Sequence, residues 1–289
     1  MRGGLVVTTV LVASAAVACG GEKDQDLVIA GTAPAVPYSG PLHVPTKNLD
    51  EDSTRATRIE SGAAGRALEC DGEIYSGGGG GAWSKSDGGS TPEEGLRAFF
   101  DMEQSDYPDH GYRVERREAD RVLYSFDVAG RTKVAVVVAK DQKNRPGWGP
   151  DTSASCDPTE LPASYTDGKW YEIWTDARGK RVPITKVHSS VGDEHCGWET
   201  AHFLSVGERD KEDEDGRLYA RDPDGVLIES MLTSAYDGDV RMPADAHDTG
   251  YRRGEWRLWL SDADLSKAYV RTADGVEAWP QVRPDQGCK

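Results

Sequence analysis

The sequence predicts an α+β fold, in which an N-terminal helix packs on an antiparallel sheet of three to four strands and a mainly antiparallel β module follows. Two patterns predict it. Apolar residues recur at helical spacing directly after a helix-start motif at residues 91–94. Apolar and polar residues then alternate in short runs bounded by turn residues. We therefore expect two modules, at residues 66–160 and 161–289.

The first 19 residues have the pattern of a bacterial lipoprotein signal. Arg2 gives a positive start, and residues 5–18 are apolar and uncharged, a stretch shorter than the roughly 20 residues that span a bilayer. Small residues precede Cys19, as in a lipobox. A signal peptide at residues 1–18 leaves Cys19 acylated, with palmitate-like chains in the lipid bilayer. The alternative is ordinary cleavage near Ala18, which leaves Cys19 as a free thiol.

Residues 19–65 are expected to form a flexible tether between this anchor and the folded modules. The segment is rich in proline, glycine, serine, threonine and charged residues, and its apolar residues show little periodicity. Residues 38–45 are the part of the tether that we expect to dock as an extended segment.

A helix is predicted to run from residue 91 to about residue 104. Thr91 caps its start, and Glu94 completes a capping box three residues later. Leu96, Phe99 and Phe100 then lie on one face. A helix with a single apolar face requires a sheet to cover that face.

Three strands are predicted to follow, within residues 111–118, 121–130 and 132–141. The second alternates apolar and polar residues, whereas residues 134–138 of the third are apolar on both faces, so the third should be central. The glycine-rich stretch at residues 76–90 is interpreted as a loop, and its unspaced glycines do not match a phosphate-binding loop.

The second module is predicted to consist mostly of antiparallel strands. A hairpin spans residues 169–185, with its turn at residues 176–179. Further alternating runs bounded by turn signals lie at residues 198–206, 216–227, 255–263 and 267–280.

Four cysteines remain once Cys19 is acylated, and an even number outside the cytoplasm indicates two disulfides. Of the three possible pairings we favour Cys70 with Cys156 and Cys196 with Cys288. Each bond then closes one module, and the two loops do not cross. A zinc site is the weaker alternative because no two of these cysteines have the C-x₂₋₄-C spacing of zinc ligands.

The chain is acidic, with 50 acidic against 34 basic residues and a formal net charge of −16. Binding of nucleic acid or of anionic lipid head groups needs clustered lysine and arginine, so this balance argues against both.

The histidines are the first candidates for a site. His188, His195 and His202 lie near Asp193 and Glu194, but a spacing of seven does not place consecutive histidines on one helical face. We interpret this stretch as a structural loop held by its cysteine. His247 stands in a loop-like stretch, and no G-x-S-x-G nucleophile elbow occurs in the sequence.

Tryptophan is abundant, with eight residues, most of them expected in a β core. If any tryptophan is exposed, we expect it to be Trp83 or Trp148, because their surroundings offer little to bury them. An exposed indole stacks on a sugar ring or a peptide. Residues 208–222 imitate a calcium loop, but Lys211 falls where an aspartate ligand is needed.

The longer segments that carry a resemblance are "ESGAAGRALECDG", "RVLYSFDVAGRTKVAVVV", "CDPTELPAS", "GDEHCGW", "MPADAHDTGYRRG" and "AYVRTADGVEAWP". Together with the lipobox, they resemble a family of uncharacterised actinobacterial, Streptomyces-like secreted lipoproteins over nearly the whole chain. The resemblance implies an extracytoplasmic location and two disulfides, and it implies no activity. The chain departs from the expected pattern at residues 147–157, which puts the last strand of the first module in doubt.

The function expected from the sequence is that of a lipoprotein on the outer face of the cytoplasmic membrane, which binds an envelope protein or a wall component. The speculative binding residues are Trp83, Trp148, His188 and His195, and no catalytic residue, metal or cofactor is indicated. The alternative is an extracytoplasmic hydrolase or metal-dependent enzyme that uses His188, His195 or His247. A surface protein without a specific ligand is a third possibility.

Overall fold

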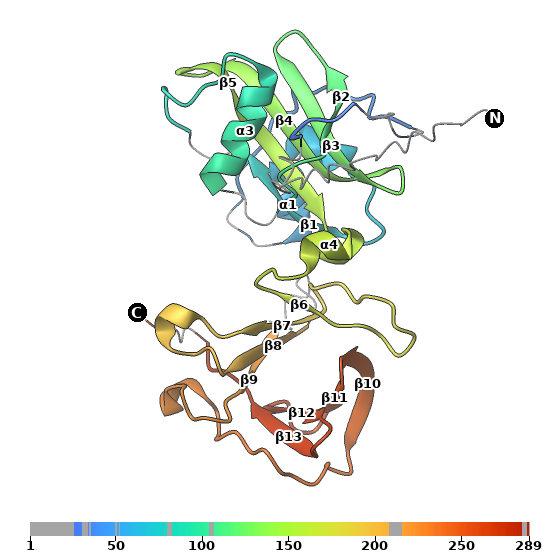
Figure 1. The fold of residues 1–289 in the computed structure, drawn as a ribbon, viewed down its shortest axis with the longest axis vertical. Helices are drawn as coiled ribbons and strands as arrows, with labels where there is room; N and C mark the ends of the chain where they lie inside the picture. The colour runs from blue at the N-terminus through green and yellow to red at the C-terminus, as the bar shows by residue number, and fades with distance from the viewer. Residues whose placement is uncertain are drawn as a thin grey trace, which may run out of the picture.

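Three antiparallel sheets make up most of the fold in the computed structural model, which describes residues 26–30, 34, 36–49, 51, 53–79, 83–103, 107–207, 216–284 and 288. One sheet of five strands forms the N-terminal module, and two sheets of four strands form the C-terminal module. Figure 1 shows the modules one above the other, with α4 (Ala163–Thr166) between them.

The α+β prediction, with an N-terminal helix on a sheet of three to four strands, is wrong. The described part of the chain contains thirteen strands, and its four α-helices are short, the longest having twelve residues. The helix predicted at residues 91–104 is present as α3 (Pro92–Glu103). The first sheet has five strands because residues 76–79 of the glycine-rich stretch lie in one strand and residues 147–156 of the doubtful segment lie in another.

The first sheet has the order β1-β5-β4-β3-β2. Its strands are β1 (Ile74–Gly79), β2 (Arg113–Arg117), β3 (Arg121–Val128), β4 (Arg131–Gln142) and β5 (Arg145–Cys156). The apolar run in β4 is central, as predicted, because a strand that is apolar on both faces has to be covered on both. Val134, Val136 and Val138 point to one core, whereas Ala135 and Val137 point to the other.

One face of this sheet is covered by α3 (Pro92–Glu103), which packs through Leu96 and Phe99. The predicted capping box is present at its start. The Thr91 hydroxyl accepts a hydrogen bond from the Glu94 amide at 3.2 Å, and the Glu94 carboxylate accepts one from the Thr91 amide at 3.2 Å.

The opposite face is covered by part of the segment that was expected to be a flexible tether. Leu42 is 1% exposed, and α1 (Thr54–Glu60) and α2 (Gly62–Ala67) lie against the sheet. The small side chains of α2 explain the close packing, because Ala63 and Ala64 are fully buried there. The described residues from 36 to 65 therefore belong to the first module, and Cys19 lies outside the described residues.

Trp83 and Trp148, the two tryptophans first expected at the surface, are buried at 3% and 8% exposure, whereas Trp170 is 52% exposed, so that expectation is wrong. The neighbouring glycines provide the space that the indoles occupy. A Cβ on Gly149 would lie 2.4 Å from Trp83 Cε2, and a Cβ on Gly95 would lie 3.0 Å from Trp148. Gly89 pairs with Trp148 through two backbone hydrogen bonds of 2.8 Å. At Gly89, Gly95 and Gly149, glycine marks close packing and not an open loop.

The C-terminal module consists of two meanders of four strands that pack face to face. The first contains β6 (Glu172–Ile173), β7 (Val187–Val191), β8 (His202–Val206) and β9 (Arg217–Arg221), and the second contains β10 (Ala246–Arg253), β11 (Trp256–Ser261), β12 (Lys267–Arg271) and β13 (Val276–Pro280). Both sheets contribute to one core, which includes Trp174 and Leu204 from the first and Leu258 and Trp279 from the second.

The two meanders are joined at both edges, so the module approaches a closed barrel. Thr175 beside β6 exchanges two hydrogen bonds with Arg252 of β10, at 2.7 and 2.8 Å. At the other edge the Val282 amide donates to the Leu218 carbonyl at 2.7 Å, next to a bridge between Tyr219 and Gln281. Joined edges leave few unpaired backbone groups.

Both predicted disulfides are confirmed: Cys70–Cys156 and Cys196–Cys288, with sequence separations of 86 and 92. Each lies within one module. In the chain-entropy model, closing loops of this length stabilises the fold by roughly 4–5 kcal/mol each. Trp198 is buried in a small core against which both cysteines of the second bond pack.

The modules are joined through the buried carboxylate of Asp157, the residue after Cys156. Its side chain accepts hydrogen bonds from the Thr159 amide and hydroxyl, at 2.9 and 2.6 Å, and from the amides of Ile184 and Thr185, at 3.3 and 3.5 Å. Arg181 adds two bonds to the segment after the first module, to the Leu161 carbonyl at 2.7 Å and to the Thr166 hydroxyl at 2.5 Å.

The glycine packing generates a first prediction. Gly149→Ala should lower the free energy of unfolding by about 2–3 kcal/mol, because the new methyl group would overlap the Trp83 ring. Chemical denaturation measures the change. Gly78→Ala is the matched control, since a Cβ there meets nothing within 4 Å, and it should change stability by less than about 0.5 kcal/mol. Equal effects of the two substitutions would refute the packing argument.

Candidate functional site

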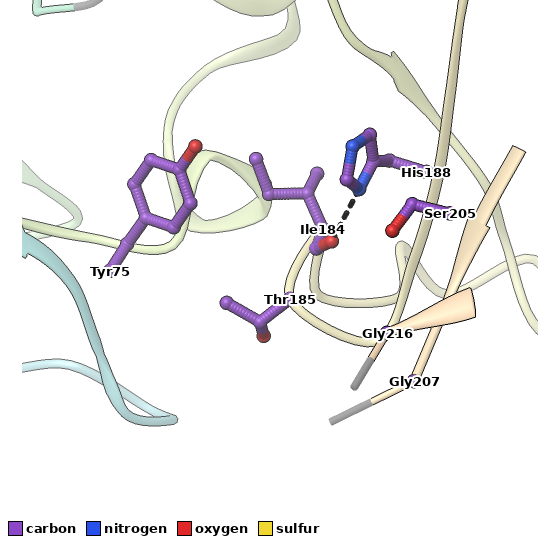
Figure 2. A pocket seen from close by; sticks show the side chains of 7 residues that line it. All are labelled: Tyr75, Ile184, Thr185, His188, Ser205, Gly207 and Gly216. Atoms are coloured by element: carbon purple, nitrogen blue, oxygen red, sulfur yellow. Dashed lines mark hydrogen bonds between the residues drawn. The ribbon is translucent and has the colours of Figure 1, made fainter. Parts of the chain in front are cut away.

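The candidate site is a pocket of about 230 Å³ between the two modules. The N-terminal module contributes Tyr75 of β1, and the C-terminal module contributes Ile184, Thr185, His188 and Ser205, with Gly207 and Gly216 at one margin. Figure 2 shows Tyr75 on one side and His188 with Ser205 on the other, with Ile184 and Thr185 between them.

Strand alternation places His188 and Ser205 on the outer face of their sheet. In β7 the side chains of Val187 and Ser189 are buried, whereas that of His188 points the other way. His188 pairs directly with Ser205 across the β7–β8 ladder, so the two side chains are neighbours on that face. Leu204, next to Ser205, points into the core.

His188 is held as a neutral hydrogen-bond acceptor. Its Nδ1 lies 2.7 Å from the Ile184 carbonyl oxygen, which can only accept, so Nδ1 carries the proton and Nε2 keeps its lone pair. Burial lowers the pKa of His188, and the bond to Ile184 and the charge of Asp157 oppose that shift only in part. The imidazole is therefore uncharged near neutral pH.

The pocket lining combines hydroxyl groups with apolar surface. Ser205 and Thr185 carry hydroxyls that both donate and accept, and Ile184 is the aliphatic member. No side chain that is charged at neutral pH lines the pocket within the described residues. Trp170, 52% exposed, packs edge-on against His188 with ring centroids 5.7 Å apart. The arrangement suits a small, neutral, polar ligand group.

The three histidines of the enzyme alternative have different surroundings. Only His188 lines the pocket. His195 is exposed beside the second disulfide, and His247 is exposed on β10, opposite Leu260. A Ser-His-Asp site needs a carboxylate on the histidine Nδ1, whereas the Nδ1 of His188 bonds to a backbone carbonyl.

The sequence predicted one residue of the pocket and missed the others. Trp83 and Trp148 pack inside the first module, away from the lining residues. The sequence does contain a signal for Ser205, because a polar residue of β8 that pairs with His188 must lie on the same face of the sheet as His188. The sequence contains no such signal for Tyr75, because it does not show which strand of the first module contacts the second module.

A second polar cluster surrounds His202, at the end of the barrel where β8 begins. Arg221 binds the Glu277 carboxylate with both ends of its guanidinium, at 2.8 and 3.0 Å, and Arg253 pairs with Glu172. Burial is the main cause that lowers the pKa of His202, and the four charges around it partly cancel. The four charged side chains are paired with one another, so we assign the cluster to the barrel and not to a binding site.

Two groups of possible metal ligands are formed largely by disulfide sulfurs. They are His195 with Cys196 and Cys288, and Glu160 with Cys70 and Cys156. A sulfur bound in a disulfide is not the thiolate that binds metals. Most of the calcium-like loop lies outside the described residues, and Asp222 at its end caps a turn by accepting bonds from the amides of Val226 and Leu227.

Comparison of the chain with known protein families, with curated proteins and with solved structures finds no match. Within the described ranges, every helix is too short or too polar to cross a membrane.

The lowered pKa of His188 generates a second prediction. Because the unfolded imidazole has a pKa of about 6.5, the unfolded chain binds more protons than the folded chain below that pH, so stability falls as the pH falls. His188→Asn keeps an N–H near the Ile184 carbonyl and cannot titrate. Between pH 6.5 and 5, the unfolding free energy of this variant should fall less steeply than that of the wild type. The two slopes should differ by up to about 1.4 kcal/mol per pH unit.

Chemical denaturation at several pH values measures the two slopes. His202 also has a burial-lowered pKa, but it is present in both proteins and cancels in the comparison. His247→Asn, a change on an exposed strand position, serves as the control. An unchanged slope in His188→Asn would show that His188 is not held neutral by burial.

Proposed function

We propose that this protein is a lipid-anchored, extracytoplasmic binding protein of the cell envelope, and that its pocket holds one neutral sugar ring of a wall component. The observation that carries the proposal is the pocket that both modules build around His188, with an uncharged lining in a chain of net charge −16. A volume of about 230 Å³ is smaller than the roughly 300–1,000 Å³ of drug-sized sites, and it suits a single ring.

The lining provides the contacts that a sugar needs. The Nε2 lone pair of His188 accepts from an amide N–H or a hydroxyl, and the Ser205 and Thr185 hydroxyls bond to ring hydroxyls. Trp170 is half exposed beside His188, where an indole can stack on the apolar face of an adjoining sugar. An acetamido sugar offers an amide N–H, hydroxyl groups and an apolar ring face.

The sequence supports the proposed anchor and location. The positive start, the short apolar segment and the small residues before Cys19 support a signal peptide followed by acylation. Two disulfides are compatible with a compartment outside the cytoplasm, where such bonds persist. A binding protein held at the membrane surface would meet the wall through its folded modules.

The binding proposal predicts a selective loss of affinity. Isothermal titration of the full chain with N-acetylglucosamine and its disaccharide should show binding that Ser205→Val weakens at least roughly tenfold, because the branched side chain removes a hydroxyl and fills space. Ser190→Val is the control, since Ser190 lies on the same face of β7 as His188 but does not line the pocket. Failure of wild type to bind either sugar, or equal losses in the two variants, would contradict the proposal.

The anchor proposal predicts that Cys19→Ser abolishes lipid attachment. In a bacterial host fed an alkyne-labelled fatty acid, the wild-type chain should carry the label and sediment with membranes, whereas Cys19→Ser should lack it and stay in the soluble fraction. A labelled or membrane-bound variant would contradict acylation at Cys19.

A further inference from the structure

The second disulfide has a histidine beside both of its sulfur atoms. The Nε2 atom of His195 lies 3.4 Å from Cys196 Sγ and 3.5 Å from Cys288 Sγ. His195 is exposed, and both cysteines are partly exposed. A donor N–H within reach of a sulfur stabilises the thiolate form of that sulfur.

From this geometry we propose that Cys196–Cys288 is a thiol–disulfide exchange site, which accepts electrons from an extracytoplasmic dithiol protein with the help of His195. The proposal does not depend on the sugar pocket, which lies where β7 begins, whereas His195 follows the end of β7.

The first disulfide provides the contrast within the same molecule. Cys156 is fully buried. Beside this bond, Lys133 Nζ pairs with the Glu160 carboxylate at 2.6 Å, and the same carboxylate accepts from the amides of Asp71 and Gly72 at 2.8 and 3.1 Å. The burial of Cys156 disfavours attack on that sulfur by an external thiolate, and the paired Glu160 carboxylate adds no free donor for a leaving thiolate.

The exchange proceeds in two balanced steps. A thiolate of the dithiol attacks one sulfur of the pair, a mixed disulfide forms, and the other sulfur leaves as a thiolate, which the His195 Nε2–H stabilises by donating a hydrogen bond and which then takes up a proton from water. The second thiol of the dithiol then loses its proton to water, its thiolate attacks the mixed disulfide, and the remaining cysteine leaves as a thiolate that takes up a proton from water. The dithiol loses two electrons and becomes a disulfide, and Cys196 and Cys288 become thiols.

The barrel does not rely on this bond alone. The edge contacts between Leu218 and Val282 and between Tyr219 and Gln281 are backbone contacts that remain when the disulfide opens. Trp198, Ala201 and Leu232 also pack in the small core beneath it. The reduced protein should therefore stay folded, as an exchange site requires.

The test is a time course of reduction of the full chain by dithiothreitol, in native buffer, read by alkylation of new thiols and peptide mass spectrometry. We expect Cys196 and Cys288 to be labelled at least roughly tenfold faster than Cys70 and Cys156. In His195→Ala, labelling of Cys196 and Cys288 should slow roughly fivefold, and His247→Ala, which changes an exposed histidine elsewhere, should leave it unchanged.

If His195 only packs against the disulfide, the opposite result is expected. Loss of that packing contact would loosen the loop and speed the reduction of Cys196–Cys288. Equal or faster labelling in His195→Ala, or equal rates for the two disulfides in wild type, would overturn the proposal. Circular dichroism of the reduced wild type serves as the second readout, and loss of the β spectrum would also overturn it.

Discussion

The arrangement of the two modules depends on one buried carboxylate. Asp157 is 3% exposed, and its oxygens accept four hydrogen bonds, two from Thr159 in its own turn and two from the amides of Ile184 and Thr185. A buried carboxylate is tolerated only when donors surround it, so the turn at residues 184–185 must stay in place. The Cys70–Cys156 bond fixes the residue before Asp157.

The candidate site follows from that joint. The turn held by Asp157 forms one wall of the pocket, and its Ile184 carbonyl sets the tautomer of His188. Strand pairing then sets Ser205 beside the ring, and packing of the modules brings Tyr75 to the opposite wall. The acceptor in the pocket therefore results from backbone positions that are fixed elsewhere, by the Asp157 carboxylate and by strand pairing.

Local patterns in the sequence predicted what depends on neighbouring residues. The capping box at Thr91, the central position of β4 and both disulfides are confirmed, because each follows from spacing or from loop closure. The fold class was wrong because glycine was interpreted only as flexibility. Gly77 lets β1 approach β5, where a Cβ would lie 2.9 Å from the Ser153 carbonyl, and Gly149 makes room for Trp83. The pocket was mostly missed, because it joins residues that only the contact between modules brings together.

The protonation state of His188 is the most direct test of the proposed binding site. A long-range ¹H–¹⁵N spectrum of the histidine side chains at neutral pH, with His188 assigned by substitution, reports which ring nitrogen carries the proton. We expect a protonated Nδ1 and an unprotonated Nε2, whose signal moves when N-acetylglucosamine is added. A protonated Nε2 in the free protein, or an Nε2 signal that does not move at saturating sugar, would contradict the proposed site.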